Sequence, residues 1–221
     1  MIDYEKETRD AYLTPSRAAE YKRYNSVDWT WGRFVTWMEM RAVARELGRY
    51  QWSPSDQLLD IPCGAGILGK VLQRFPFRIV ASDISAEMLT LARPEYPSDR
   101  LAACTQADIT ATPFPRASFA CVVTLSFLHR VPLEVKRAAL REIAALSNRV
   151  VIINCSVDTP LQRIKHAVLS RIRRKHVPAP CPAPLSEIIA ECESQGLHVV
   201  RSSMVVPMLS ACALLVLEKR G

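Results

Sequence analysis

Three aspartates, Asp60, Asp83 and Asp108, each follow a short apolar stretch and could bind a ligand through charge or hydrogen bonds. Between the first two lies GAGILG, residues 64–69, which matches the GxGxxG pattern of dinucleotide-binding turns. Glycines in such a turn allow the backbone to approach any nucleotide-like ligand closely. The pattern alone is therefore compatible with more than one ligand.

The charge of Asp60 separates two classes of ligand. A carboxylate at the end of the first strand would face the pyrophosphate of NAD or FAD across a low-dielectric crevice, where like charges repel each other. S-adenosylmethionine instead carries a sulfonium and an ammonium group and has no phosphate. Asp60 therefore favours the methyl donor over a dinucleotide.

The segments that would position these aspartates alternate between strand and helix. Short, largely apolar stretches predict strands over 57–61, 77–83, 101–108, 119–128 and 149–155. Apolar residues at three-to-four-residue steps predict helices over 67–72, 85–93 and 133–146. This alternation predicts an α/β fold, a Rossmann-like and mostly parallel sheet with helices on both faces.

The two ends of the chain complete this domain. Helical spacing in 31–47 predicts a helix within an N-terminal segment, 1–50, that covers the ligand site. Residues 51–221 would form the main domain, with a basic helical and proline-rich insertion at 159–185.

Beyond the insertion we expect a helix at 186–195 and two strands at 198–207 and 210–219. These last two strands are close enough in sequence to pair antiparallel. They would bring the sheet to seven strands, with an antiparallel last strand.

Composition limits the cellular context of the chain. Its 221 residues are 49% hydrophobic and 23% charged, an ordinary globular balance, and no apolar run approaches the ~20 residues of a transmembrane helix. The seven cysteines are scattered without a CxxC pair, which argues against a disulfide framework or a zinc site. We therefore expect a cytoplasmic protein without a transmembrane segment or a bound metal.

Four stretches occur in a characteristic order: LLDIPCGAG, IVASDIS, QADI and FACVVTLSFLHRV, with successive aspartates 23 and 25 residues apart. In these motifs the chain resembles the class I S-adenosylmethionine-dependent methyltransferases, particularly the small-molecule branch that includes the ubiquinone and menaquinone methyltransferases. The resemblance covers about residues 56–155. One departure is Pro62, where the family often has glycine, because proline removes a backbone N–H.

The resemblance implies a role for the residues of the glycine turn. Asp60, Gly64 and Gly66 would line the methionine half of S-adenosylmethionine. Asp83 would accept hydrogen bonds from both ribose hydroxyls, since one carboxylate can accept two at once.

The remaining cofactor contacts implied by the resemblance lie further along the chain. Ile84 and Met88 would flank the adenine ring. Asp108 would accept a hydrogen bond from the adenine amino group, and the backbone N–H of Ile109 would donate one to a ring nitrogen. Ser126 would lie beside the methionine portion.

Two further residues have a functional and a structural interpretation. Tyr21 lies in a segment, 16–25, that loosely resembles one preceding the core in the quinone branch, and it could close over the methionine moiety or simply pack a helix. His129 follows the fourth strand and could act as a general base, or it could be a structural histidine bonded to the backbone.

A basic segment, 163–176, lies in a window without any acidic residue between Asp158 and Glu187. It could be a solvated helix face, or it could contact an anionic acceptor or a membrane surface. The chain has no recognisable RNA-binding module, which argues against a nucleic acid partner.

These observations predict a methyltransferase that acts on a small-molecule or lipid-linked acceptor, with an anionic acceptor favoured by the basic segment. Two alternatives remain open. One is an NAD(P)-dependent oxidoreductase that uses GAGILG, and the other is a protein that binds S-adenosylmethionine without catalysis.

Overall fold

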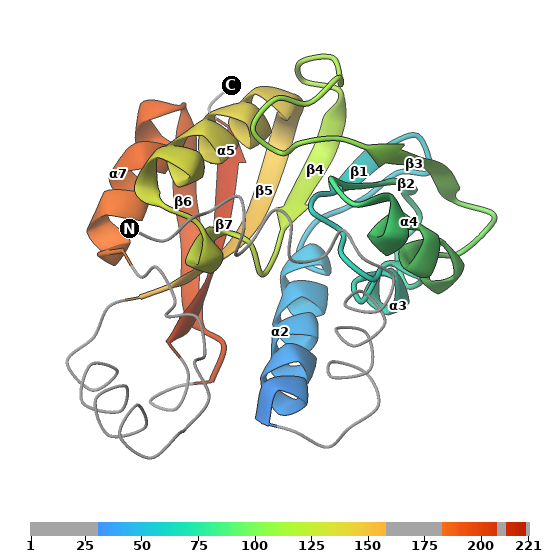
Figure 1. The fold of residues 1–221 in the computed structure, drawn as a ribbon, viewed down its shortest axis with the longest axis horizontal. Helices are drawn as coiled ribbons and strands as arrows, with labels where there is room; N and C mark the ends of the chain where they lie inside the picture. The colour runs from blue at the N-terminus through green and yellow to red at the C-terminus, as the bar shows by residue number, and fades with distance from the viewer. Residues whose placement is uncertain (1–30, 158–182, 207–210, 220–221) are drawn as a thin grey trace.

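A computed structural model describes residues 31–157, 183–206 and 211–219. Its centre is a seven-stranded sheet in the order β3-β2-β1-β4-β5-β7-β6 (Figure 1). The strands are β1 (Gln57–Asp60), β2 (Arg78–Asp83), β3 (Leu101–Gln106), β4 (Phe119–Thr124), β5 (Ser147–Ser156), β6 (Leu197–Met204) and β7 (Cys212–Lys219). Strands β1 to β5 pair in parallel, and β7 pairs antiparallel with both β5 and β6. The predicted fold class is confirmed.

Helices cover both faces of the sheet (Figure 1). They are α2 (Trp31–Leu47), α3 (Gly69–Leu72), α4 (Ala86–Ala92), α5 (Leu133–Leu146) and α7 (Leu185–Ser194). Buried residues of α5 and α7 pack in one hydrophobic cluster, and those of α2, α3 and α4 pack in a second cluster on the opposite face.

The central strands supply side chains to both clusters in turn. Leu59 and Val122 belong to the cluster beneath α5, whereas their neighbours Leu58 and Cys121 belong to the cluster beneath α2. Successive side chains of a strand point to opposite faces of the sheet. A strand covered on both faces must therefore be apolar throughout, which explains the uninterrupted apolar run of β4.

Two elements are shorter than their sequence pattern predicts. The helix after the glycine turn begins at Gly69 rather than at Ile67, and comprises only the four residues of α3. Strand β4 ends at Thr124 because Ser126, at φ +58°, leaves the extended conformation. The chain then forms a short 3₁₀ helix, Leu128–Arg130.

Side-chain contacts hold α2 against the C-terminal strands. The buried carboxylate of Glu46 accepts a hydrogen bond from Arg201 Nε of β6 at 2.6 Å. Just after the helix, Tyr50 donates its hydroxyl to Glu218 of β7 at 2.7 Å. These contacts hold the C-terminal end of α2 against β6 and β7. Among the described helices, none is both long enough and apolar enough to span a bilayer.

Candidate active site

The turn after β1 depends on its glycines for two reasons. Gly64 and Gly66 have φ values of +52° and +79°, a backbone conformation that residues with a side chain rarely adopt. A Cβ on Gly66 would also lie 2.7 Å from the carbonyl oxygen of Ala92, and one on Gly69 would overlap the backbone carbonyl of Glu95. The pattern GAGILG therefore shapes the turn and lets it pack closely against the end of α4.

Asp60 ends β1 and is 2% exposed. Its carboxylate accepts a hydrogen bond from the hydroxyl of Tyr96 at 2.5 Å. The pKa of Asp60 is raised to about 7 as the net result of three effects. Burial raises it most, the hydrogen bond from Tyr96 lowers it, and the negative charge of Asp83 raises it. A cationic ligand at this position would stabilise the ionised carboxylate.

Asp83 ends β2, and its carboxylate is tied to the same glycine turn. One oxygen accepts the backbone N–H of Gly64 at 2.8 Å, and the other accepts the N–H of Ser85 at 3.0 Å. Burial raises the pKa of Asp83, while these hydrogen bonds lower it. Each carboxylate oxygen can accept a further hydrogen bond, so Asp83 can still bind a pair of hydroxyls.

Helix α4 begins with the predicted N-cap. The hydroxyl of Ser85 accepts the backbone N–H of Met88 at 3.1 Å. Met88 is buried against Ala65 of the glycine turn and Leu91. The residue next to Asp83, Ile84, is partly exposed, and its carbonyl accepts a hydrogen bond from the side chain of Gln106 at 2.9 Å.

Asp108 and Ile109 follow β3, the neighbour of β2 in the sheet. One oxygen of Asp108 accepts both the backbone N–H and the hydroxyl of Thr110, at 2.9 Å and 2.7 Å. Asp108 therefore stabilises its own turn, and its second oxygen can still accept from a ligand. Ile109 is buried next to it.

Ser126 belongs to a hydrogen-bond network between β4, β5 and α2. Its backbone N–H donates to Asn154 Oδ1 at 2.7 Å, and the amide nitrogen of Asn154 donates to the carboxylate of Glu39. The Glu39 carboxylate also accepts from the thiol of Cys212 at 3.5 Å. Burial raises the pKa of Glu39, and these hydrogen bonds lower it.

A cavity of about 50 Å³ brings together the glycine turn, Asp60 and Ser126, whereas Asp83, Met88 and Asp108 do not line it. It is lined by Asp60, Gly64 and Ser126, which the sequence predicted, and by Glu39 of α2, which it did not. Among the described residues, none of those lining it is basic. The cavity is therefore suited to a cationic group.

The family model described as "Methyltransferase domain" matches residues 58–149. Residues 58–149 therefore have the sequence pattern of a methyltransferase domain. The match ends just inside β5, so it includes the glycine turn and the ends of β1 to β4.

Solved structures of methyltransferases share the fold of this chain at low sequence identity. Magnesium protoporphyrin IX methyltransferase from Synechocystis PCC 6803, solved with bound SAH, is 17% identical with a TM-score of 0.81, covering 98% of this chain and 100% of that chain. A TehB-like methyltransferase from Corynebacterium glutamicum is 14% identical with a TM-score of 0.63, covering 94% of this chain and 100% of that one.

A third similar structure is geranyl diphosphate C-methyltransferase from Streptomyces coelicolor. It is 14% identical with a TM-score of 0.59, covering 81% of this chain and 76% of that one. At these identities the likeness establishes the fold. None of the curated proteins matches this chain in sequence.

His129, the predicted general base, lies in the 3₁₀ helix after β4. Its Nε2 accepts a hydrogen bond from Arg130 Nε at 3.3 Å. Burial and the charges of Arg130 and Lys136 lower its pKa to about 3. The imidazole is therefore neutral at pH 7 but weakly basic, and its catalytic role stays a prediction. Tyr21 and the basic segment 163–176 lie outside the described residues.

Three residues of the candidate site were not predicted from the sequence: Glu39, Tyr96 and Asn154. The Asp60–Tyr96 pair is 36 residues apart in sequence and the Glu39–Asn154 pair is 115 apart. None of the three stands in a motif. The one local signal was the presence of a polar residue, Asn154, in the otherwise apolar stretch of β5.

Replacing Glu39 with alanine is expected to lower the free energy of unfolding by about 1–3 kcal/mol, because the amide of Asn154 would lose its acceptor in a buried site. Glu39→Gln is the matched control, since its side-chain oxygen can still accept this bond. Urea unfolding of both variants measures the difference. Equal stability of Glu39→Ala and the wild type would show that the network contributes nothing to folding.

Proposed function

We propose that this protein transfers a methyl group from S-adenosylmethionine to a small-molecule acceptor. The observation that carries the proposal is the buried Asp60 carboxyl beside the glycine turn, with a pKa raised to about 7 and Asp83 nearby. A pyrophosphate would add negative charge to this pair, whereas an ammonium or sulfonium group would offset it.

The similar structures support the choice of cofactor. Magnesium protoporphyrin IX methyltransferase was crystallised with SAH and with SAM. In this chain, Asp60 and Glu39 both line the small cavity and would face the positively charged methionine end there. Asp83 would accept the ribose hydroxyls, and Met88, Asp108 and Ile109 would contact the adenine.

Bound S-adenosylmethionine supplies an electrophilic methyl group on a sulfonium. Binding this cation too tightly would stabilise the ground state more than the transition state, since the charge on sulfur disappears as the methyl leaves. We therefore assign to Asp60 and Glu39 the task of orienting the donor, and rate acceleration would come from alignment of two reactants in a site shielded from water.

The nature of the acceptor determines whether a base is needed. An acceptor that loses a proton on attack would need one, and His129 is the residue we propose for this step despite its low pKa. The named substrates of the similar structures, a magnesium porphyrin and geranyl diphosphate, support a small organic acceptor. We propose further that this acceptor is lipid-linked or anionic. Membership of the quinone branch stays a prediction.

Calorimetry with S-adenosylhomocysteine and with NAD tests the proposed cofactor. We expect binding of S-adenosylhomocysteine and none of NAD. Binding of NAD alone would favour the oxidoreductase alternative. Transfer of labelled methyl groups to a panel of small-molecule extracts then tests catalysis, and binding without any transfer would favour the non-catalytic alternative.

The affinity for S-adenosylhomocysteine is expected to rise by about tenfold from about pH 6 to about pH 8, because Asp60, with a pKa of about 7, gains its charge over this interval. The ligand's ammonium group stays protonated throughout. Titration calorimetry at several pH values measures the effect. Asp60→Asn should bind with the same affinity at each pH, and a variant that kept the full pH dependence would contradict this assignment.

The Asp60 carboxyl gives the stability of the free protein a pH dependence of the opposite sign: its contribution to stability falls as the pH rises. Its pKa in the folded protein is raised above the usual value of 3.8, so the folded state binds the proton more tightly than the unfolded state. Its contribution to stability is therefore fully present below about pH 4 and is lost as the pH rises towards 7. Thermal unfolding of wild type and Asp60→Asn across this range measures that loss.

A further inference from the structure

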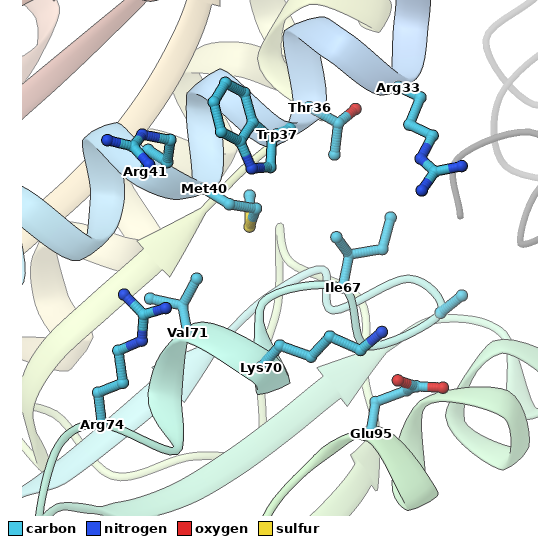
Figure 2. A pocket seen from close by; sticks show the side chains of 11 residues that line it. Arg33, Thr36, Trp37, Met40, Arg41, Ile67, Lys70, Val71, Arg74 and Glu95 are labelled. Atoms are coloured by element: carbon cyan, nitrogen blue, oxygen red, sulfur yellow. The ribbon is translucent and has the colours of Figure 1, made fainter. Parts of the chain in front are cut away.

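A second cavity, of about 510 Å³, lies between α2 and α3 (Figure 2). Four of its lining residues are basic: Arg33, Arg41, Lys70 and Arg74. Glu95 is the single acidic residue among the described residues that line it. Figure 2 shows the residues of α2 facing Lys70 and Arg74 across the opening. The lining carries a net positive charge, which favours an anionic ligand.

Most of this charge is not neutralised within the described protein. Arg41, Lys70 and Arg74 form no ion pair with any described carboxylate. All three are exposed. Arg41 instead lies over the ring of Trp37, with its guanidinium carbon 4.9 Å from the ring centroid.

The basic residues surround an apolar surface. Met40, Ile67 and Val71 line the same cavity, and Trp37 forms its rim with 52% of its surface exposed. Trp31 and Trp37 are two of the three large hydrophobic residues exposed in the described chain, and both are in α2. Exposed tryptophan next to arginine and lysine is typical of surfaces that lie at a lipid–water interface.

We propose that the cavity between α2 and α3 binds the phosphate headgroup of an anionic phospholipid, so that the protein docks on an anionic membrane through this face. Arg41, Lys70 and Arg74 would contact the headgroup, and Trp37 would enter the interface. The apolar floor would contact the glycerol and upper acyl chains. A single cavity of this size suits one headgroup, whereas a nucleic acid would need basic residues along an extended track.

This docking face adjoins the small cavity beside Asp60, because Thr36, Met40, Ala65 and Ile67 line both cavities. A protein bound in this way would present the methionine end of its proposed cofactor site towards the membrane. Docking would depend only on the charge and shape of the α2–α3 face, and not on methyl transfer.

Co-sedimentation with vesicles tests the proposal. We expect the protein to bind vesicles of phosphatidylcholine and phosphatidylglycerol, to bind pure phosphatidylcholine weakly, and to dissociate as salt is raised. Reversing two charges, in Lys70→Glu with Arg74→Glu, should lower the partition coefficient at least about tenfold. Trp37→Ser should lower it several-fold without changing the salt dependence.

The matched control is Arg116→Glu with Arg141→Glu, which has the same net charge but changes exposed residues outside the cavity. Thermal unfolding shows whether each variant is folded. An equal loss of binding in the control would show that net charge alone explains the loss, and would overturn the proposed site. Three other results would also overturn it: equal binding to neutral vesicles, complete displacement by inorganic phosphate at matched ionic strength, and tighter binding to an oligoribonucleotide than to anionic vesicles.

Discussion

Gly66→Ala is expected to lower the free energy of unfolding by about 3 kcal/mol and the melting temperature by about 6–12 °C. Two effects add at this position. An alanine at φ +79° has a strained backbone, and its Cβ would lie 2.7 Å from the carbonyl oxygen of Ala92. Because that oxygen belongs to the backbone, relief of the clash requires the glycine turn and the end of α4 to move apart.

A matched control separates the two effects. Gly196 has almost the same backbone angle, φ +76°, but a Cβ there would meet nothing within 4 Å. Gly196→Ala should therefore show only the cost of the left-handed backbone, about 1 kcal/mol. Thermal and urea unfolding of both variants give the comparison. Equal destabilisation of the two would contradict the close approach of the turn to α4.

Asp83→Ala is expected to weaken binding of S-adenosylhomocysteine by about 1.5–3 kcal/mol, which is a roughly 10- to 150-fold rise in Kd. The variant loses the acceptor proposed for the ribose hydroxyls. It also frees the N–H groups of Gly64 and Ser85, which the carboxylate holds in the folded turn. Both effects act on the ligand site, so this is the largest expected loss of affinity among the residues considered.

Asp56→Ala is the control for this experiment. Asp56 accepts the backbone N–H of Ser53 at 2.8 Å in an exposed turn before β1, so its loss removes a similar hydrogen bond away from the site. Calorimetry should give an unchanged Kd for this control. An unchanged Kd for Asp83→Ala would remove Asp83 from the cofactor site. Unfolding temperatures of both variants show how much of the effect is lost stability.

Helix α2 connects the two cavities of this protein. Glu39 is buried and holds Asn154 and thereby Ser126, while Trp37, two residues away, is on the exposed side. Residues two apart in a helix point in nearly opposite directions. One helix can therefore contribute to the proposed cofactor site with one face and to the proposed membrane face with the other.

The core of the fold could be predicted because each strand carries its own signal. The central strands are buried on both faces, which requires continuous apolar runs such as that of β4. Asp60 and Asp83 were found for the same reason, since each is a charged residue at the end of such a run, and parallel strands end at one edge. The boundaries of α3 and β4 were less well predicted: α3 begins at Gly69 rather than at Ile67, and β4 ends early because Ser126 has a positive φ.

The parallel sheet, the glycine turn and the carboxylates at the strand ends could be inferred from the amino-acid sequence, because they depend on residues that are close together in the chain. The side chains that meet those carboxylates could not be inferred in this way, because they depend on the folded arrangement. Tyr96 reaches Asp60, and Glu39 reaches Asn154, across folded distances that no local pattern encodes. The pKa of Asp60 and the basic cavity beside α2 have the same origin: burial and charge depend on neighbours that only folding brings together.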